Sequence, residues 1–429
     1  MRKFKKALAI SLAAALMLGS LAGCGDDADE TATESGESAV NEDAIENLIA
    51  ATEGTVELTV WASEEDQDFT QGLLDSFVEL YPDVDFDITL GACSEADTKD
   101  TVLTDIEAAA DVFAFADDQI NELVNAGALQ AVSATYTYDV AGENAAGSVE
   151  AATIDGTLYA YPMTSDNGYF LYYNSDIFSE EDVQSLDQMI EVAEAAGVQI
   201  GMIVSDAWYN YSFFKGAGYD VTLNDDGVTN TCNWNDEGAT DVAQAIIDLG
   251  NTGVFVGVAD DATIVTGVQE GTYAAVVSGV WNADTIEEAW GDAYAATKLP
   301  TYTVAGEQVQ MASFSGYKLI GVNAYSDNVG WSMLLAEYLT NEESQVARFE
   351  ARGLGPANTN AAASEAVQAS PAIAALAEQA AYAVPQRVGG NYWEPANTLG
   401  SILISGNPDG TDLQELLDTA VAGIEAAAE

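Results

Sequence analysis

The chain has 429 residues, and 48% of them are hydrophobic. This length exceeds what one hydrophobic core usually organises, so we expect at least two domains. Its 71 Asp and Glu against 11 Lys and Arg give a formal net charge of −60, which disfavours binding to nucleic acid, anionic lipid and anionic ligands. The sequence contains no histidine, so the commonest metal ligand and the commonest general base of enzymes are both missing.

Residues 1–23 have the pattern of a secretory signal peptide. The basic stretch MRKFKK precedes the apolar run ALAISLAAALMLGSLAG, which is too short for a comfortable membrane span. The run ends in LAGC before the polar GDDADE, which resembles the bacterial lipobox, where the cysteine is lipidated. We therefore expect a lipid anchor on Cys24 that holds the protein at the extracytoplasmic face of the cell membrane. An ordinary signal peptide with an unrelated cysteine is the alternative.

Removal of the signal peptide would leave seven Lys and Arg against 71 Asp and Glu, a net charge of −64. If Cys24 carries lipid, Cys93 and Cys232 are the remaining cysteines, and they lie too far apart in the chain to form a ligand motif. We expect both to be free or buried, with a disulfide between them as the alternative, and we expect no metal site and no cofactor.

Residues 24–54 are expected to form an acidic, disordered tether. The segment 25–54 contains ten acidic residues, no basic residue and no aromatic residue, and it is rich in Ser, Thr, Ala and Gly. Such a composition buries too little apolar surface to offset the entropy lost on ordering.

Strand-like and helix-like segments alternate after the tether. TVELTVWA is rich in β-branched residues, and the segment after it places Leu73, Leu74 and Phe77 at helical spacing before Pro82. The expected strands are 55–62, 84–90 and 111–116, and the expected helices are 68–83, 95–109 and 118–129. This alternation predicts an α/β fold with a mainly parallel sheet flanked by helices, whose ligands bind beyond the carboxyl ends of the strands.

The second half repeats the α/β mixture with more aromatic residues. The stretch EGTYAAVVSGVWNAD, residues 270–284, reads as a buried strand that ends just before Trp281. Further segments continue the pattern: an aromatic-rich segment 205–221, helices at 242–253, 370–383 and the C-terminus, two helices within 329–353, and a strand at 316–326.

From about residue 55 to the end, the chain resembles the extracellular solute-binding proteins of bacterial ABC sugar importers, especially the maltose-binding-protein-like group. The resemblance depends on ordered pieces, none specific alone, that include ELTVWASEEDQ, ADVFAFADDQINELVNAGALQAV, DGTLYAYPMTSDNGYFLYYNSDIF, GTYAAVVSGVWN, SFSGYKLIGVNAYS and VPQRVGGNYWEPANTLGSIL. It implies two α/β lobes with a ligand cleft between them. The implied first lobe is 55–163 plus 318–369, and the second is 166–313 plus 372–429.

The resemblance also implies aromatic residues that stack on sugar rings. Trp281 and Trp393 match such positions, with Tyr392 beside the latter. Trp208 and Tyr209 match the aromatic segment of the second lobe, where one of the pair is expected to pack in the core. A core role is the alternative for Trp281.

Polar residues of the first lobe are the implied partners of sugar hydroxyls. Glu65 and Asp66 follow the first strand, where the maltose-binding pattern has an acid and then a lysine, so Asp66 argues against maltose itself. Arg387 is expected to meet an acidic neighbour rather than the ligand. The full set of expected ligand-binding residues is Trp61, Glu65, Asp66, Asp117, Asp118, Asp166, Asn167, Trp208, Tyr209, Trp281, Tyr392 and Trp393.

The resemblance predicts a monomeric, lipid-anchored receptor that does no chemistry. It would capture a neutral sugar or oligosaccharide and deliver it to the transmembrane subunits of an ABC permease. A binding protein for a non-sugar solute is the main alternative. A surface glycan-binding protein and a glycosidase with paired carboxylates are further alternatives, and cleavage of oligosaccharides would identify the glycosidase.

Overall fold

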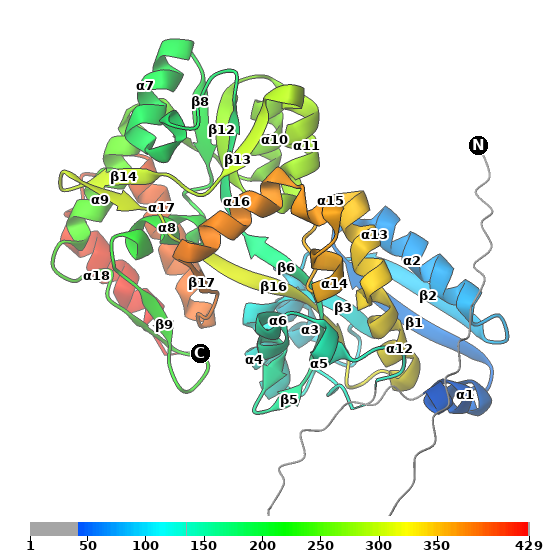
Figure 1. The fold of residues 1–429 in the computed structure, drawn as a ribbon. Coiled ribbons are helices and arrows are strands. Elements are labelled where there is room, and N and C mark those ends of the chain that lie inside the picture. The colour runs from blue at the N-terminus through cyan, green and yellow to red at the C-terminus, as the bar shows by residue number, and fades with distance from the viewer. Residues whose placement is uncertain (1–41, 134, 428–429) are drawn as a thin grey trace, which may run out of the picture. The chain divides into compact units, whose positions relative to one another are not determined.

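The computed structural model describes residues 42–133 and 135–427. Two β-sheets, each flanked by helices, organise this part of the chain (Figure 1). The first sheet has the strand order β17-β16-β3-β1-β2, with β6 also paired to β16. Its strands are β1 (Thr55–Ala62), β2 (Asp85–Ala92), β3 (Val112–Ala116), β6 (Ala160–Gly168), β16 (Ser313–Val322) and β17 (Ala383–Pro385).

The predicted parallel pairing is present in the first sheet. Strand β1 pairs in parallel with both β2 and β3, while β16 runs antiparallel to β3 and β6. Alternate residues of β3 enter different hydrophobic clusters: Val112 and Ala114 pack in one, Phe113 and Phe115 in the other. The sheet therefore has a buried face on each side, as expected for strands covered by helices on both faces.

The second sheet has the order β11-β8-β12-β7-β13. Strand β8 pairs in parallel with β11 and β12, and β7 runs antiparallel to β12 and β13. All six residues of β12 are buried, which confirms the strand predicted before Trp281. The strands are β7 (Phe170–Asn174), β8 (Gln199–Met202), β11 (Phe255–Gly257), β12 (Tyr273–Ser278) and β13 (Tyr294–Thr297).

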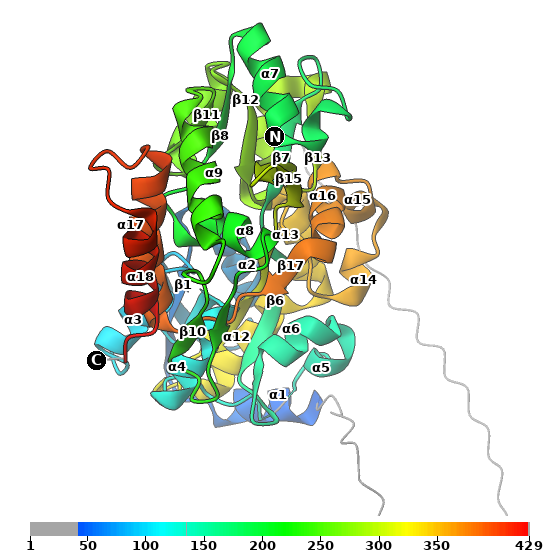
Figure 2. The ribbon, with the colours of Figure 1, turned by 90° about the vertical axis from the view of Figure 1, so that its left-hand side faces the viewer.

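The helices surround the two sheets largely where apolar spacing predicted them. The expected helix 95–109 is shorter, because α3 ends at Thr104 and Asp105 is extended. Helix α17 packs against α9 and α18 (Figure 2). The principal helices are α2 (Gln67–Leu80), α3 (Thr98–Thr104), α4 (Ile120–Asn125), α7 (Leu186–Ala196), α8 (Ala207–Gly216), α9 (Ala239–Asn251), α10 (Asp261–Gln269), α11 (Ala283–Trp290), α12 (Val329–Thr340), α13 (Glu342–Arg352), α16 (Pro371–Gln379), α17 (Trp393–Ile404) and α18 (Leu413–Ile424).

The antiparallel pair β6 and β16 links the two sheets. Strand β6 ends at Gly168 and β7 of the second sheet begins at Phe170, so the chain passes directly from one sheet to the other. The crossings predicted near 163–166 and 314–318 lie within these two strands, and the one predicted near 370–372 lies at the start of α16. The exact limits of the two lobes remain a prediction.

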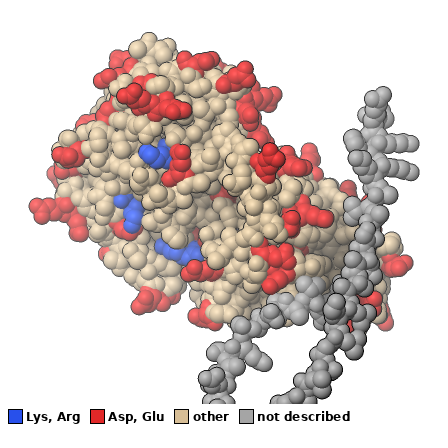
Figure 3. All heavy atoms as spheres, viewed as in Figure 1, with Lys and Arg blue, Asp and Glu red and all other residues tan. Residues whose placement is uncertain are grey.

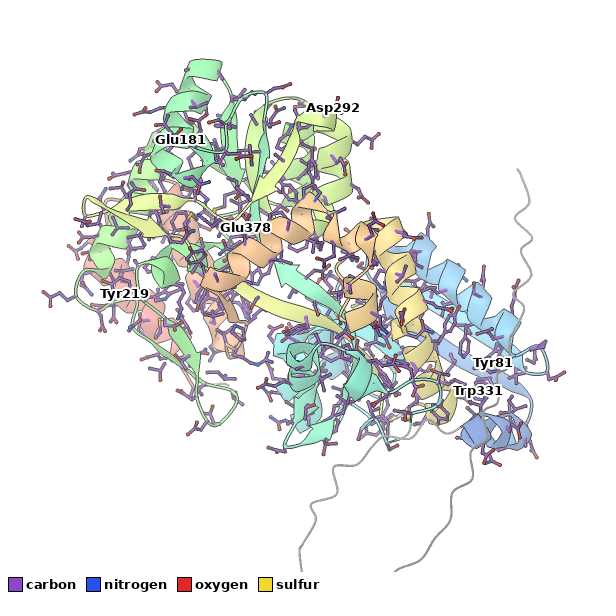
Figure 4. The ribbon with its side chains drawn as sticks, in the orientation of Figure 1. Tyr81, Glu181, Tyr219, Asp292, Trp331 and Glu378 are labelled. Carbon is purple, nitrogen blue, oxygen red and sulfur yellow. The ribbon has the colours of Figure 1, made fainter. Side chains whose placement is uncertain are left out.

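The expectation of a disordered tether through residue 54 is wrong over its last part, because α1 (Glu42–Ala51) is a helix. Ile45, Leu48 and Ile49 recur at helical spacing and pack against the core of the first sheet. Thr52 accepts a hydrogen bond of 2.9 Å from Trp331 Nε1. Trp331 meets Tyr81 edge-on, and the two labelled side chains lie close together in Figure 4.

The predicted signal peptide, Cys24 and the tether up to residue 41 lie outside the described residues. Within the described ranges, no helix combines the length and the apolar character needed to cross a lipid bilayer. Cys93 and Cys232 are both free, as predicted.

Candidate functional site

A cavity of about 580 Å³ lies where strands of both sheets end. Most of its lining residues lie at or after the carboxyl ends of β2 and β3 in the first sheet and of β8, β11 and β12 in the second. The others come from β6, β16, the segment after β17, and helix α17. This is the position at which parallel α/β sheets bind ligands. The lining residues are Ser94, Glu95, Ala96, Asp97, Lys99, Asp100, Ala116, Asp118, Gln119, Asn167, Asp206, Trp208, Asp261, Trp281, Lys318, Gln386, Trp393 and Asn397.

Three tryptophans line the cavity on the side of the second sheet. Trp208 is in the first turn of α8, Trp281 is in the 3-10 turn after β12, and Trp393 begins α17. The ring centroids of Trp208 and Trp281 are 5.7 Å apart, with 40° between the ring planes. All three rings are only partly buried, so they present apolar faces to the cavity.

Hydrogen bonds fix two of these rings. Trp281 Nε1 donates to Asp261 Oδ1 at 3.1 Å, and Trp208 Nε1 donates to Gln386 Oε1 at 2.6 Å. A Cβ atom at Gly279 would lie 2.0 Å from the Trp281 ring, so the ring can adopt this position only because residue 279 is glycine. The backbone therefore places Trp281 just after the end of β12, and the hydrogen bond to Asp261 holds its ring there.

Asp118 is the first-sheet carboxylate that faces the cavity from the end of β3. Burial raises the pKa of Asp118 to about 7, and the negative charge of Asp117 adds to this rise. A side-chain hydrogen bond with Gln386 and the charge of Lys99 act in the opposite direction. Asp118 Oδ1 is buried and, among the described residues, has no hydrogen-bond partner.

Asp117 does not line the cavity, although it is adjacent to Asp118. Its carboxylate is 1% exposed and accepts hydrogen bonds from Arg387 at 2.8 Å and from the Tyr317 amide at 3.0 Å. This confirms that Arg387 meets an acidic neighbour. Gln119 lines the cavity but uses its side chain to hold the loop before α3, donating to the carbonyls of Glu95 and Ala96.

The residues predicted at the end of β1 and just after it also lie outside the cavity lining. Asp66 is buried and pairs with Arg352 at 2.8 Å and Arg348 at 3.6 Å, both from α13. Glu65 is exposed, and Trp61 lies against Gly91, where a Cβ atom would be 2.9 Å from its ring. The structure thus gives Asp66 ion-pair partners in α13 and places Trp61 against β2 of the first sheet.

At the first crossing, Asn167 lines the cavity and Asp166 does not. Asp166 is 1% exposed and accepts a short hydrogen bond from the Gly355 amide. Burial raises the pKa of Asp166, opposed chiefly by the positive charge of Lys318. Asp166 therefore holds the segment after α13 against β6.

Tyr209 and Tyr392 are buried in the core of the second sheet. Tyr209 contacts Trp208 at a centroid distance of 5.1 Å, and the Tyr392 hydroxyl donates to the Ala207 carbonyl at 2.8 Å. These two residues therefore support Trp208 and the start of α8 from the side of the core.

The structure adds cavity residues beyond the predicted set, chiefly Asp206, Asp261, Gln386 and Asn397. Asn397 lies one turn after Trp393 in α17, so helical spacing could have identified it. Asp206 and Asp261 follow β8 and β11, and the strand-end rule could have identified them. Gln386 follows the short β17, and no local pattern distinguishes it.

Comparison with known proteins gives consistent matches. Residues 73–375, more than half of the chain, match the family model described as bacterial extracellular solute-binding protein. The chain is 27% identical over 446 residues to the galactooligosaccharide-binding protein of Bacillus subtilis (strain 168), covering 99% of both chains.

Solved structures also match over most of the chain. A structure with acarbose is 29% identical, with a TM-score of 0.77, and the match covers 87% of this chain and 99% of that one. The maltodextrin binding protein MalE1 from L. casei BL23 without ligand is 23% identical, with a TM-score of 0.70, and covers 87% of this chain and 100% of that one. These likenesses confirm the two-lobe α/β fold.

Proposed function

Because the chain belongs to the bacterial extracellular solute-binding protein family, we propose that it captures a sugar or short oligosaccharide and delivers it to an ABC permease. The observation that carries this proposal is the cavity of about 580 Å³ with Trp208, Trp281 and Trp393 on one side and polar side chains around them. The relatives that bind galactooligosaccharide, maltodextrin and acarbose support the same ligand class.

The chemistry of the lining suits a carbohydrate. A sugar ring has C–H faces that pack on flat aromatic rings and an edge of hydroxyl groups that need hydrogen-bond partners. Asp118, Asn167 and Asn397 offer carboxylate and amide groups from three different elements around the cavity. Polar groups placed in this way reject a ligand that leaves them buried and unpaired.

The remaining predicted residues act indirectly in this proposal. Tyr209 and Tyr392 hold the tryptophan-bearing elements, and Asp66, Asp117 and Asp166 hold elements of the first sheet and the crossing strands. The lobes would close on the ligand about β6 and β16, which gives the permease a conformation to recognise. The protein would do no chemistry, act as a monomer, and be held at the membrane by lipid on Cys24.

The test is calorimetric titration with maltotriose, maltotetraose, galactotriose and the matching monosaccharides. Bound ligand should also raise the melting temperature, because it stabilises the folded state by mass action. Replacement of Trp281 or Trp393 by Ala should weaken binding by about tenfold or more, because each ring contributes apolar contact area in the cavity.

Trp290→Ala is the matched control, since it removes a partly buried indole at the end of α11 that packs on the same core but does not line the cavity. Binding should be unchanged in this variant. Unchanged affinity in both Trp281→Ala and Trp393→Ala would contradict the site, and cleavage of the oligosaccharides would contradict the function.

A further inference from the structure

Carboxylates dominate the charged groups of the cavity. Six of them line it, namely Glu95, Asp97, Asp100, Asp118, Asp206 and Asp261. The two lining cations are both ion-paired: Lys99 with Glu122 at 3.0 Å and Asp100 at 3.4 Å, and Lys318 with Glu95 at 3.7 Å. Asp118, Asp206 and Asp261 therefore face the cavity without an ion pair to any Lys or Arg of residues 42–133 and 135–427.

Asp206 and Asp261 lie beside the tryptophan pair. Asp206 Oδ1 accepts from the Trp208 amide at 2.8 Å, and Asp261 Oδ1 accepts from Trp281 Nε1 at 3.1 Å. Burial raises the pKa of Asp206, and the charge of Asp261 adds to the rise, so the two carboxylates repel each other across this wall. Two aromatic faces and two carboxylates thus converge on one part of the cavity.

Asp118, on the first-sheet side of the cavity, also has an oxygen atom that a bound ligand could contact. Its Oδ1 atom is buried, and no hydrogen bond satisfies it within the described part of the chain. A buried carboxylate oxygen without a donor is costly, and a bound donor removes this cost.

We propose that the cavity selects saccharides that carry a protonated amine, with the ammonium group held by Asp206 and Asp261 beside the cavity-facing sides of the Trp208 and Trp281 rings. This inference deepens the proposed function and rests on it. An ammonium group in this position gains attraction from the carboxylates and a cation–π contact with the rings. It also relieves the repulsion between Asp206 and Asp261.

The charge of the whole protein favours the same ligands. The formal net charge of −60 raises the local concentration of cations and speeds their association. Figure 3 shows Asp and Glu spread over the visible face with few Lys or Arg among them. The field of the protein brings a cationic saccharide to the cavity, and the paired carboxylates retain it.

The experiment compares neutral and amine-bearing forms of the same saccharides near neutral pH. Maltotriose and galactotriose are titrated beside derivatives in which an amine replaces the primary hydroxyl of one ring, each ring in turn. At least one derivative should bind about five- to tenfold more tightly than its neutral parent. Raising NaCl from about 50 mM to about 500 mM should reduce this preference but not the affinity of the parent.

Conservative variants locate the effect. Asp206→Asn and Asp261→Asn keep an acceptor oxygen and remove the charge, so each should reduce the preference for the amine by about threefold or more. Asp260→Asn is the matched control, because Asp260 is an acid next to Asp261 that caps α10 and does not line the cavity. It should leave the preference unchanged.

The outcomes separate this inference from the proposed function. If a neutral parent binds and none of its amine derivatives binds more tightly, the amine preference is wrong and the proposed function stands. If an amine derivative binds more tightly but Asp260→Asn lowers the preference as much as Asp206→Asn and Asp261→Asn, the assignment to these two carboxylates is overturned. If neither the parents nor the derivatives bind, both proposals fail.

Discussion

Adjacent carboxylates in this protein serve different purposes, and their partners decide which. Asp117 and Asp118 occupy the same 3-10 turn after β3. Asp117 turns inward to Arg387, while Asp118 faces the cavity with one oxygen unsatisfied among the described residues. The turn advances about a third of a revolution per residue, so neighbouring side chains point to different surroundings.

The pKa of Asp118 gives a prediction about stability. Because the folded-state pKa is raised from 3.8 to about 7, the ionised form is disfavoured in the folded protein. Stability associated with the protonated group is fully present below 3.8 and is lost as the pH rises through about 7. In Asp118→Asn this loss is absent, so the variant should become more stable than the parent by about 1–3 kcal/mol above neutral pH.

Urea unfolding across this pH range measures the effect. The variant and the parent should differ little at acid pH, and the difference should grow with pH toward neutrality. Asp182→Asn serves as control, because hydrogen bonds with Ser179 lower the pKa of that exposed carboxyl instead. A difference between Asp118→Asn and the parent that stays constant with pH would contradict the assignment.

At the scale of elements, a short segment after β17 connects the two walls of the cavity. Gln386 accepts from Trp208 and hydrogen-bonds Asp118, and Arg387 pairs with Asp117. The chain then reaches Gly389, whose amide donates to Asn230 Oδ1 on the second-sheet side. These contacts connect the end of β3 to the tryptophan-bearing elements.

Arg387→Gln tests the strength of this connection. It leaves the Asp117 carboxylate, which is 1% exposed, without its cation, so the free energy of unfolding should fall by about 2–4 kcal/mol. The double variant Asp117→Asn, Arg387→Gln should recover part of this loss, because no buried charge is then unpaired. Lys215→Gln, which breaks a more exposed pair with Asp220, should cost less than about 1 kcal/mol. Equal losses from Arg387→Gln and Lys215→Gln would contradict a buried connection.

Sequence patterns predicted the elements better than the contacts between them. Strand periodicity placed Trp281 just after a buried strand of the second sheet, and the family resemblance added Trp208; both line the cavity. The resemblance also placed Asp66 in the site, but its partners Arg348 and Arg352 lie nearly 300 residues later in the chain, beyond the reach of any local pattern. Helix α1 was not predicted, because the average composition of residues 25–54 is polar and acidic. That average hid the helical spacing of the apolar residues within the ten residues of α1.

At the scale of the whole molecule, charge is distributed very unevenly. Among the Lys and Arg in the described ranges, all but Lys298 are ion-paired. These cations are engaged in local pairs, and most of the Asp and Glu in the same ranges form no ion pair. Repulsion among these carboxylates opposes the compact state, while the buried pairs with Arg348 and Arg387 support it.

Salt should therefore stabilise the protein rather than weaken it. Raising KCl from about 10 mM to about 500 mM screens the exposed carboxylates over distances beyond a few ångströms, whereas buried pairs are screened much less. The melting temperature should rise by several degrees, and the rise should shrink at mildly acid pH, where many exposed carboxylates are protonated. Differential scanning calorimetry at the two salt concentrations and the two pH values measures both effects. A melting temperature that falls with salt near neutral pH would show instead that the ion pairs, and not the excess of carboxylates, dominate the electrostatic contribution to stability.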